Sequence, residues 1–151
     1  MRKCMRKPVN GVILMVEDNP DDARLVERQL QNSGLNYALR VVSDGREAMD
    51  YLSGVGAYVD RATFPMPCLL LIDLRMPRVD GFMLTEWVRN NPVTKDIPIV
   101  IYSILPSSEE AERAYALGAN AYVVKLPGVR SFDLLFAALQ EYCDAARFTG
   151  A

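Results

Sequence analysis

The stretch Cys68-Leu69-Leu70-Leu71-Ile72-Asp73 decides the fold class of this chain. Every position between the cysteine and the aspartate is aliphatic, so a strand formed here would bury both of its faces. Strands of that kind lie at the centre of parallel sheets that carry helices on both sides. Asp73 closes this most buried strand, which makes its carboxylate the first candidate for the chemistry of the protein.

Working outward from this strand, four further apolar runs alternate with helical patterns. The expected strands are Val12–Val16, Tyr37–Val42, Ile97–Ser103 and Ala121–Val124, and the expected helices cover about 20–33, 45–53, 81–90, 107–117 and 131–146. Alternation repeated in this way predicts an α/β fold, a doubly wound five-stranded parallel sheet with helices on both faces.

Capping residues stand at two of the expected helix starts. Asn19-Pro20-Asp21-Asp22 combines an N-cap, a proline at the first helical position and acids in the first turn. Ser107-Ser108-Glu109-Glu110 has the pattern of a capping box. The stretch 54–67 is punctuated by glycine and proline, and we expect a rather long loop there.

Length and composition are those of an ordinary globular domain. The chain has 151 residues, half of them hydrophobic, and a net charge of −2, which does not suggest a general nucleic-acid or membrane-surface binder. We expect a disordered basic leader over 1–10, one domain over 11–146 and a short tail over 147–151. No apolar stretch approaches the roughly 20 residues of a membrane helix, and a cytoplasmic location is expected.

Two residue types narrow the possible chemistry. The chain has no histidine, which excludes a histidine-based catalytic triad and a histidine-bearing phosphorelay protein. Cys4, Cys68 and Cys143 are odd in number and far apart, so neither a disulfide framework nor a zinc site is indicated. Cys68 opens an apolar run and is expected to be a small core hydrophobe.

The ends of the expected strands bring one set of polar residues together. Glu17 and Asp18 end the first strand, Asp73 the third, Ser103 the fourth and Lys125 the fifth, and in such sheets the working site lies beyond these carboxyl ends. Clustered carboxylates repel unless a cation joins them, and Mg²⁺ suits such oxygen ligands. Each residue alone has an ordinary explanation as a turn or helix-start residue, but their joint placement predicts phosphoryl chemistry on a carboxylate.

Several motifs resemble the receiver domain of response regulators. They are Val16–Asn19, Leu71–Pro77 with Asp80-Gly81, Ile101–Ser103 and Gly118–Lys125, and the resemblance covers about 12–145. It implies the strand order 2-1-3-4-5 of the flavodoxin-like fold. Asn19-Pro20-Asp21-Asp22 and the long loop before the third strand are most similar to stand-alone receivers associated with bacterial phytochromes.

The resemblance also implies roles for the residues at the strand ends. Asp73 would accept a phosphoryl group from the phosphohistidine of a sensor histidine kinase, in this subfamily a bacteriophytochrome. Asp18, Asp73 and the backbone carbonyl of Arg75 would bind Mg²⁺, and Glu17 would hold a metal-bound water. Lys125 would pair with the aspartyl phosphate.

Two further residues are implied as parts of a switch. Ser103 would bind a phosphoryl oxygen, and Tyr122 matches the aromatic position that changes rotamer between the two states. From the sequence alone, Tyr122 is equally well an ordinary half-buried strand residue. The chain departs from the family at Ile104, where a small residue is usual, and at Leu126, which stands before Pro127 where proline normally follows the lysine directly.

These departures leave a second function open. A pseudo-receiver would bind a partner through the same fold without phosphorylation. An aspartate-nucleophile phosphatase is disfavoured, because those enzymes carry a second aspartate two residues after the nucleophile and Arg75 stands there. We therefore expect a phosphoacceptor with slow self-dephosphorylation at most, and not an enzyme.

The last helix suggests a contact surface. Leu134, Ala138 and Tyr142 fall partly outside its core-facing stripe. We expect a homodimer through the side formed by the fourth helix, fifth strand and fifth helix. The alternative is a terminal helix that is simply more buried than the pattern indicates.

Overall fold

The computed structural model describes residues 9–125 and 130–149, and within the last helix the side chains of 132–144. The strands are β1 Val12–Val16, β2 Ala38–Val42, β3 Leu69–Ile72, β4 Ile99–Ser103 and β5 Ala121–Val124. The helices are α1 Pro20–Asn32, α2 Gly45–Ser53, the short 3₁₀ helix η1 Gly56–Tyr58, α3 Gly81–Asn90, α4 Ser108–Leu117 and α5 Arg130–Thr149.

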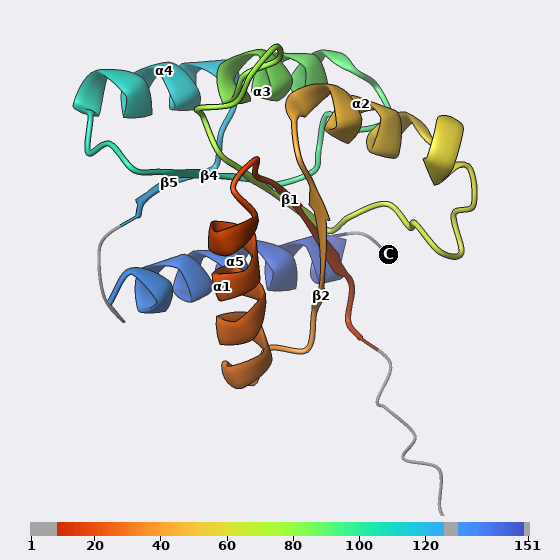
Figure 1. Cartoon of the computed structure of the whole chain (residues 1–151), viewed down its shortest axis with the longest axis horizontal. Coiled ribbons are helices and arrows are strands. Elements are labelled where there is room, and N and C mark those ends of the chain that lie inside the picture. The colour runs from red at the N-terminus through yellow and green to blue at the C-terminus, as the bar shows by residue number, and fades with distance from the viewer. Residues whose placement is uncertain (1–8, 126–129, 150–151) are drawn as a thin grey trace, which may run out of the picture.

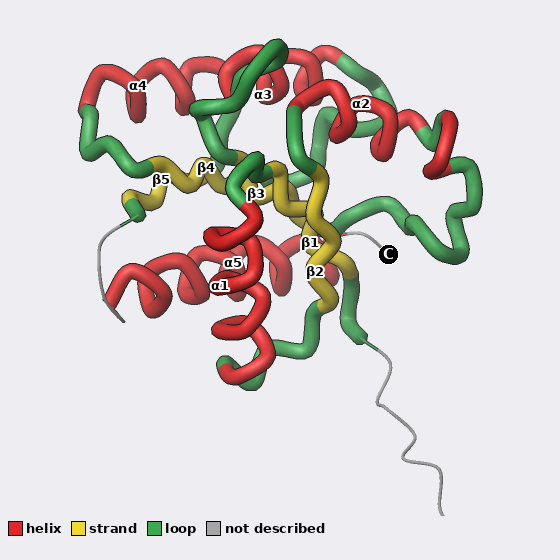
Figure 2. Tube along the Cα trace, in the orientation of Figure 1, coloured by secondary structure: helices red, strands yellow, loops and turns green. Residues whose placement is uncertain are grey.

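The five strands form one parallel sheet in the order β2-β1-β3-β4-β5, as the resemblance implied. Helices α2, α3 and α4 cover one face of this sheet, and α1 and α5 cover the other (Figure 1). Figure 2 shows the strands between these two helical layers. The expected doubly wound α/β fold is therefore confirmed.

Burial follows this layering. Strand β3 is completely buried, with Leu69, Leu70, Leu71 and Ile72 each 0% exposed. Leu70 and Ile72 belong to the core cluster that packs under α2, α3 and α4, while Leu69 and Leu71 belong to the one under α1 and α5. A strand with two apolar faces thus sits between two cores, which is why the run before Asp73 has no polar residue.

The register of the strands places their carboxyl ends at one level. Val16 of β1 pairs with Ile72 of β3, so Glu17 and Asp73 leave the sheet side by side. The Asp73 N–H still donates to the Val16 carbonyl at 3.0 Å, which holds the aspartate against the end of β1. This register brings together acids that are far apart in sequence.

Helix starts follow the expected capping pattern with one difference. The Asn19 side chain accepts hydrogen bonds from the Asp21 and Asp22 N–H groups, and the Ser107 side chain accepts one from the Glu110 N–H. The Glu110 carboxylate does not complete the capping box, because it pairs with Arg75 instead. A tertiary ion pair has replaced half of a local motif.

Other differences from the expected boundaries lie at element ends. The loop 54–67 contains η1, and the Arg61 guanidinium donates to the Tyr51 and Leu52 carbonyls at the end of α2 and to the Phe64 carbonyl in the loop, which ties the loop to α2. Helix α5 continues to Thr149, into the stretch expected to be a tail. Asn10 already donates its N–H to the Asn36 carbonyl, and the leader residues 1–8 lie outside the described residues.

Among the described residues, none of the helices combines the length and apolarity needed to cross a membrane.

Candidate functional site

Three carboxylates meet at the carboxyl ends of β1 and β3. Glu17, Asp18 and Asp73 each offer an oxygen, and these oxygens lie within 4.8 Å of one another. Glu17 is buried, Asp18 is exposed and Asp73 is intermediate between them. The cluster therefore opens to solvent on the Asp18 side and is closed on the Glu17 side.

The ammonium of Lys125 reaches this cluster from the end of β5. Its Nζ donates to Glu17 Oε1 at 2.6 Å and lies 3.7 Å from Asp73 Oδ2. The side chain of Lys125 is only 15% exposed. Burial by itself lowers the pKa of this ammonium, but the hydrogen bond to Glu17 and the nearby carboxylate charges outweigh burial and raise the pKa. Lys125 is thus held as a fixed cation beside Asp73.

The surroundings of Glu17 disfavour its ionised form. Burial, followed by the contact with the Asp73 carboxylate, raises its pKa to about 9, although Lys125 works in the opposite direction. Its Oε2 is buried and has no hydrogen-bond partner among the described residues. A buried acceptor without a donor is costly, and a cation at this point would satisfy it.

The donor set fits a hard divalent metal ion. All three clustered side chains offer carboxylate oxygens, which are the ligands that such ions prefer. The buried Glu17 Oε2 without a partner and the negative charge in excess of Lys125 point the same way. Glu17, Asp18 and Asp73 are therefore the residues that would hold the metal, directly or through water.

The loop after β3 ties the cluster to α4. The Arg75 N–H donates to Asp73 Oδ1 at 3.1 Å, and the Arg75 guanidinium forms an ion pair with Glu110 in the first turn of α4. The Arg75 side chain thus points away from Asp73, toward α4. The role of the Arg75 carbonyl as a metal ligand stays a prediction.

Ser103 and Tyr122 lie at the end of β4 and in β5. Ser103 is 0% exposed, and its hydroxyl accepts a long hydrogen bond of 3.4 Å from the Leu105 N–H. The Tyr122 hydroxyl donates to the Leu105 carbonyl at 2.8 Å and lies 3.5 Å from Glu110 Oε2. Both residues therefore hold the loop between β4 and α4, and their switch role stays a prediction.

The two departures from the family pattern have different outcomes. Ile104 is 66% exposed, so its bulk stands in solvent rather than in the core. Leu126 and Pro127 lie outside the described residues.

Asp22 is a site residue that the sequence did not indicate. Its Oδ2 accepts a hydrogen bond from Lys125 Nζ at 3.2 Å. In the sequence, Asp22 is only an acid in the first turn of α1, which a helix N-terminus explains without any other partner. No local pattern relates it to a lysine 103 residues later in the chain.

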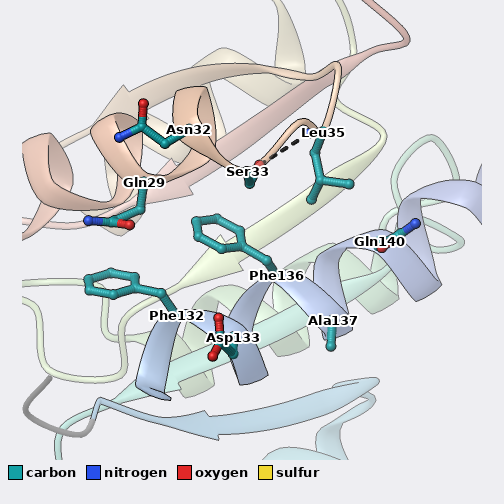
Figure 3. A pocket seen from close by; sticks show the side chains of 9 residues that line it. All are labelled: Gln29, Asn32, Ser33, Leu35, Phe132, Asp133, Phe136, Ala137 and Gln140. Carbon is teal, nitrogen blue, oxygen red and sulfur yellow. Dashed lines mark hydrogen bonds between the residues drawn. The ribbon is translucent and has the colours of Figure 1, made fainter. Parts of the chain in front are cut away.

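A separate hollow of about 390 Å³ lies between α1 and α5. Figure 3 shows Phe132 and Phe136 of α5 turned toward α1, with the amide of Gln29 facing them. None of the clustered carboxylates lines it, and the lining contains one acid, Asp133. This hollow is therefore distinct from the candidate site.

One known protein family matches most of the chain. The family model described as the response regulator receiver domain matches residues 13–132. The chain belongs to the response regulator receiver family. The matched region contains the carboxylate cluster, Ser103 and Lys125. Receivers of this family act in two-component signal transduction and are in general signalling proteins rather than enzymes.

Similar proteins cover most of this receiver. Response regulator Rcp1 of Synechocystis sp. is 30% identical over 131 residues, which are 87% of each chain. The structure of its Mn²⁺-bound form matches with a TM-score of 0.74 and 31% identity, over 86% of this chain and 91% of Rcp1.

Two further similar structures are response regulators of phytochromes. The phosphorylated cyanobacterial phytochrome response regulator RcpA has a TM-score of 0.76 and 32% identity, over 87% of this chain and 92% of its own. The bacteriophytochrome response regulator AtBRR has a TM-score of 0.73 and 36% identity, over 87% and 91%. The receivers similar to this one thus include a metal-bound form and a phosphorylated form.

Proposed function

We propose that this receiver accepts a phosphoryl group on Asp73 from the phosphohistidine of a sensor histidine kinase. The observation that carries the proposal is the position of Asp73 at the end of the fully buried strand β3, with the ammonium of Lys125, whose side chain is only 15% exposed, at 3.7 Å. A carboxylate at the end of a rigid strand is held in place, and a fixed cation beside it favours an incoming anionic group.

The chemistry requires little of the protein beyond positioning and charge. An Asp73 carboxylate oxygen attacks phosphorus, the bond from phosphorus to the kinase histidine breaks, and an aspartyl phosphate forms. Lys125 and the Ser103 hydroxyl would then bind phosphoryl oxygens. Mg²⁺, when bound by Asp18, Asp73 and the Arg75 carbonyl with Glu17 on a bound water, supplies positive charge that offsets the charge of the phosphoryl oxygens.

The relatives favour one kind of kinase. RcpA and AtBRR are described as phytochrome and bacteriophytochrome response regulators, so we propose a bacteriophytochrome as the kinase partner. We propose the cytoplasm as the location of this transfer. We propose no contact with nucleic acid or membrane.

The test is transfer from a kinase with a labelled phosphohistidine, and separately from acetyl phosphate, with Mg²⁺ or with a chelator. We expect labelling that needs the metal and that a kinase with an inactive histidine does not produce. A receiver that binds the kinase but takes no label from either donor would be a pseudo-receiver, and the proposal would be wrong.

Asp22 is expected to help position Lys125 for this reaction. Its side chain is 41% exposed, so the pair with Lys125 is worth little, and Asp22→Ala should slow labelling by acetyl phosphate roughly two- to fivefold at saturating Mg²⁺. The matched control is Asp21→Ala, the neighbouring first-turn acid, which pairs with Arg24. Equal rates for the two variants would show that only the helix-start charge matters.

We also propose a homodimer through the side formed by α4, β5 and α5. Leu134 of α5 is 58% exposed and Tyr115 of α4 is 50% exposed, which supports a contact there. Two of the three residues expected to form this surface are partly buried instead. Ala138 and Tyr142 lie against the core under α1 and α5, and the Tyr142 hydroxyl donates to the Asn120 carbonyl at 2.9 Å.

Leu134→Glu is expected to weaken this dimer by roughly tenfold or more, because it places a charge in an apolar contact. Sedimentation at micromolar concentration, before and after phosphorylation, measures the effect. Val93→Glu is the control, since Val93 is 74% exposed in the turn after α3. A monomer in both states, whatever stands at position 134, would rule the dimer out.

A further inference from the structure

Two cysteine sulfurs touch at the end of the sheet opposite to the carboxylate cluster. Cys68 directly precedes β3, and Cys143 lies in the second half of α5. Their Sγ atoms are 3.6 Å apart, although the two residues are 75 positions apart in sequence. Both are free thiols. The proposed receiver chemistry uses neither of them.

The surroundings hold the two sulfurs against each other. The Cys68 N–H donates to the Val12 carbonyl at 2.8 Å, which fixes the start of β3. Next to Cys143, the Asp144 carboxylate accepts a hydrogen bond of 2.8 Å from the Tyr37 hydroxyl, which fixes α5 at this turn. A Cβ added to Gly11 would lie 3.1 Å from Cys68 Sγ, so the glycine leaves room for this sulfur. The contact is therefore built into the packing.

The two thiols differ in their access to solvent. Cys143 is 0% exposed, whereas Cys68 is partly exposed. The hydrogen bond with the Cys143 thiol lowers the pKa of the Cys68 thiol, against the effect of burial, and the same pairing raises the pKa of Cys143. A small oxidant can thus reach Cys68 first, and the nucleophilic thiolate forms more readily there.

We propose that Cys68 and Cys143 form a peroxide-sensitive thiol pair that closes into an intramolecular disulfide. The Cys68 thiolate attacks an oxygen of hydrogen peroxide, the O–O bond breaks, and hydroxide leaves and takes a proton to become water. Cys143 sulfur then attacks the Cys68 sulfenic acid, the S–S bond forms and a second water leaves. Two thiols and one peroxide give one disulfide and two waters.

The bond needs only a small movement and has a measurable consequence. A disulfide sulfur pair is about 2.05 Å apart, so the sulfurs must approach by roughly 1.5 Å. The bond would tie α5 to the start of β3 and restrict the unfolded chain, which should raise the Tm by roughly 5–10 °C. Asp73 stands at the other end of β3, so labelling from acetyl phosphate should stay within about twofold of the reduced protein.

The test treats the full chain with hydrogen peroxide, unfolds it in urea with N-ethylmaleimide present so that every thiol still free is blocked, and maps the peptides by mass spectrometry. We expect a linked pair of peptides containing Cys68 and Cys143, a raised Tm and reversal of both by dithiothreitol. Cys4→Ser should keep the bond. Cys143→Ser should lose it and leave Cys68 as a sulfenic or sulfinic acid.

Three results would overturn the proposal. In the first, the maleimide alkylates both Cys68 and Cys143 of the wild-type protein. In the second, Cys68 is oxidised to the sulfinic acid and no linked peptide appears. In the third, disulfides join only separate chains. Because the mapping is done on the wild-type chain, a variant that fails to fold does not affect the result.

Discussion

Replacing Asp73 with asparagine is expected to lower the rate of phosphoryl labelling by roughly 100-fold or more relative to wild type. An amide cannot act as the nucleophile that a carboxylate provides, and the neighbouring Glu17 is buried and paired with Lys125. Asparagine has nearly the same shape and can still accept the hydrogen bond from the Arg75 N–H, so the fold is retained. Labelling by phosphorylated kinase and by acetyl phosphate, with Mg²⁺ present, measures the loss.

The control for this experiment is Asp21→Asn. It removes the same charge from a nearby first-turn residue whose side chain is 81% exposed. We expect Asp21→Asn to be labelled like wild type. Labelling of Asp73→Asn at the wild-type rate would contradict the assignment and would point to Asp18, the exposed member of the cluster.

Glu17→Gln is expected to remove a pH dependence from the stability of the metal-free protein and to weaken Mg²⁺ binding. The pKa of Glu17 is raised from 4.5 to about 9, chiefly by burial. The folded protein therefore keeps this proton while the unfolded chain has already lost it. The resulting stability is fully present below about pH 4.5 and is lost as the pH rises through about 9.

The size of this effect has an upper limit. One proton changes the free energy of unfolding by at most about 1.4 kcal/mol per pH unit, so in the presence of a chelator the wild type should lose up to about 2.7 kcal/mol between about pH 6 and pH 8. Glu17→Gln should be nearly flat over this range, because glutamine does not ionise, and Lys125 keeps Asp22 and Asp73 as partners. Urea unfolding at the two pH values measures both slopes.

With Mg²⁺ present, Glu17→Gln is expected to be the weaker of the two proteins in metal binding. The metal favours the ionised carboxylate, and a glutamine at position 17 should lower Mg²⁺ affinity by roughly 10- to 100-fold, the usual cost of losing a group that orients metal ligands. Glu86→Gln, an exposed substitution on α3, is the control. A wild-type slope that is flat in chelator, or a Glu17→Gln variant with unchanged Mg²⁺ affinity, would contradict this account.

Features with a local or periodic cause were predictable from the amino acids. The apolar run before Asp73 required a strand buried on both faces, and β3 is 0% exposed throughout. Asn19 and Ser107 accept the helix-start hydrogen bonds that their positions predict. The rule that strand ends meet at one edge of a parallel sheet brought Glu17, Asp73 and Lys125 together in advance, and the resemblance to receivers supplied the strand order.

Pairings between distant segments were decided only when the chain folded. Asp22 with Lys125, Arg75 with Glu110 and Cys68 with Cys143 join residues 103, 35 and 75 positions apart. Each of these side chains also satisfies a local pattern, as a first-turn acid, a loop residue or a small core hydrophobe, so the sequence carries no sign of the second partner. Such contacts depend on how helices lie across the sheet, because packing brings the side chains within reach and short-range preferences do not.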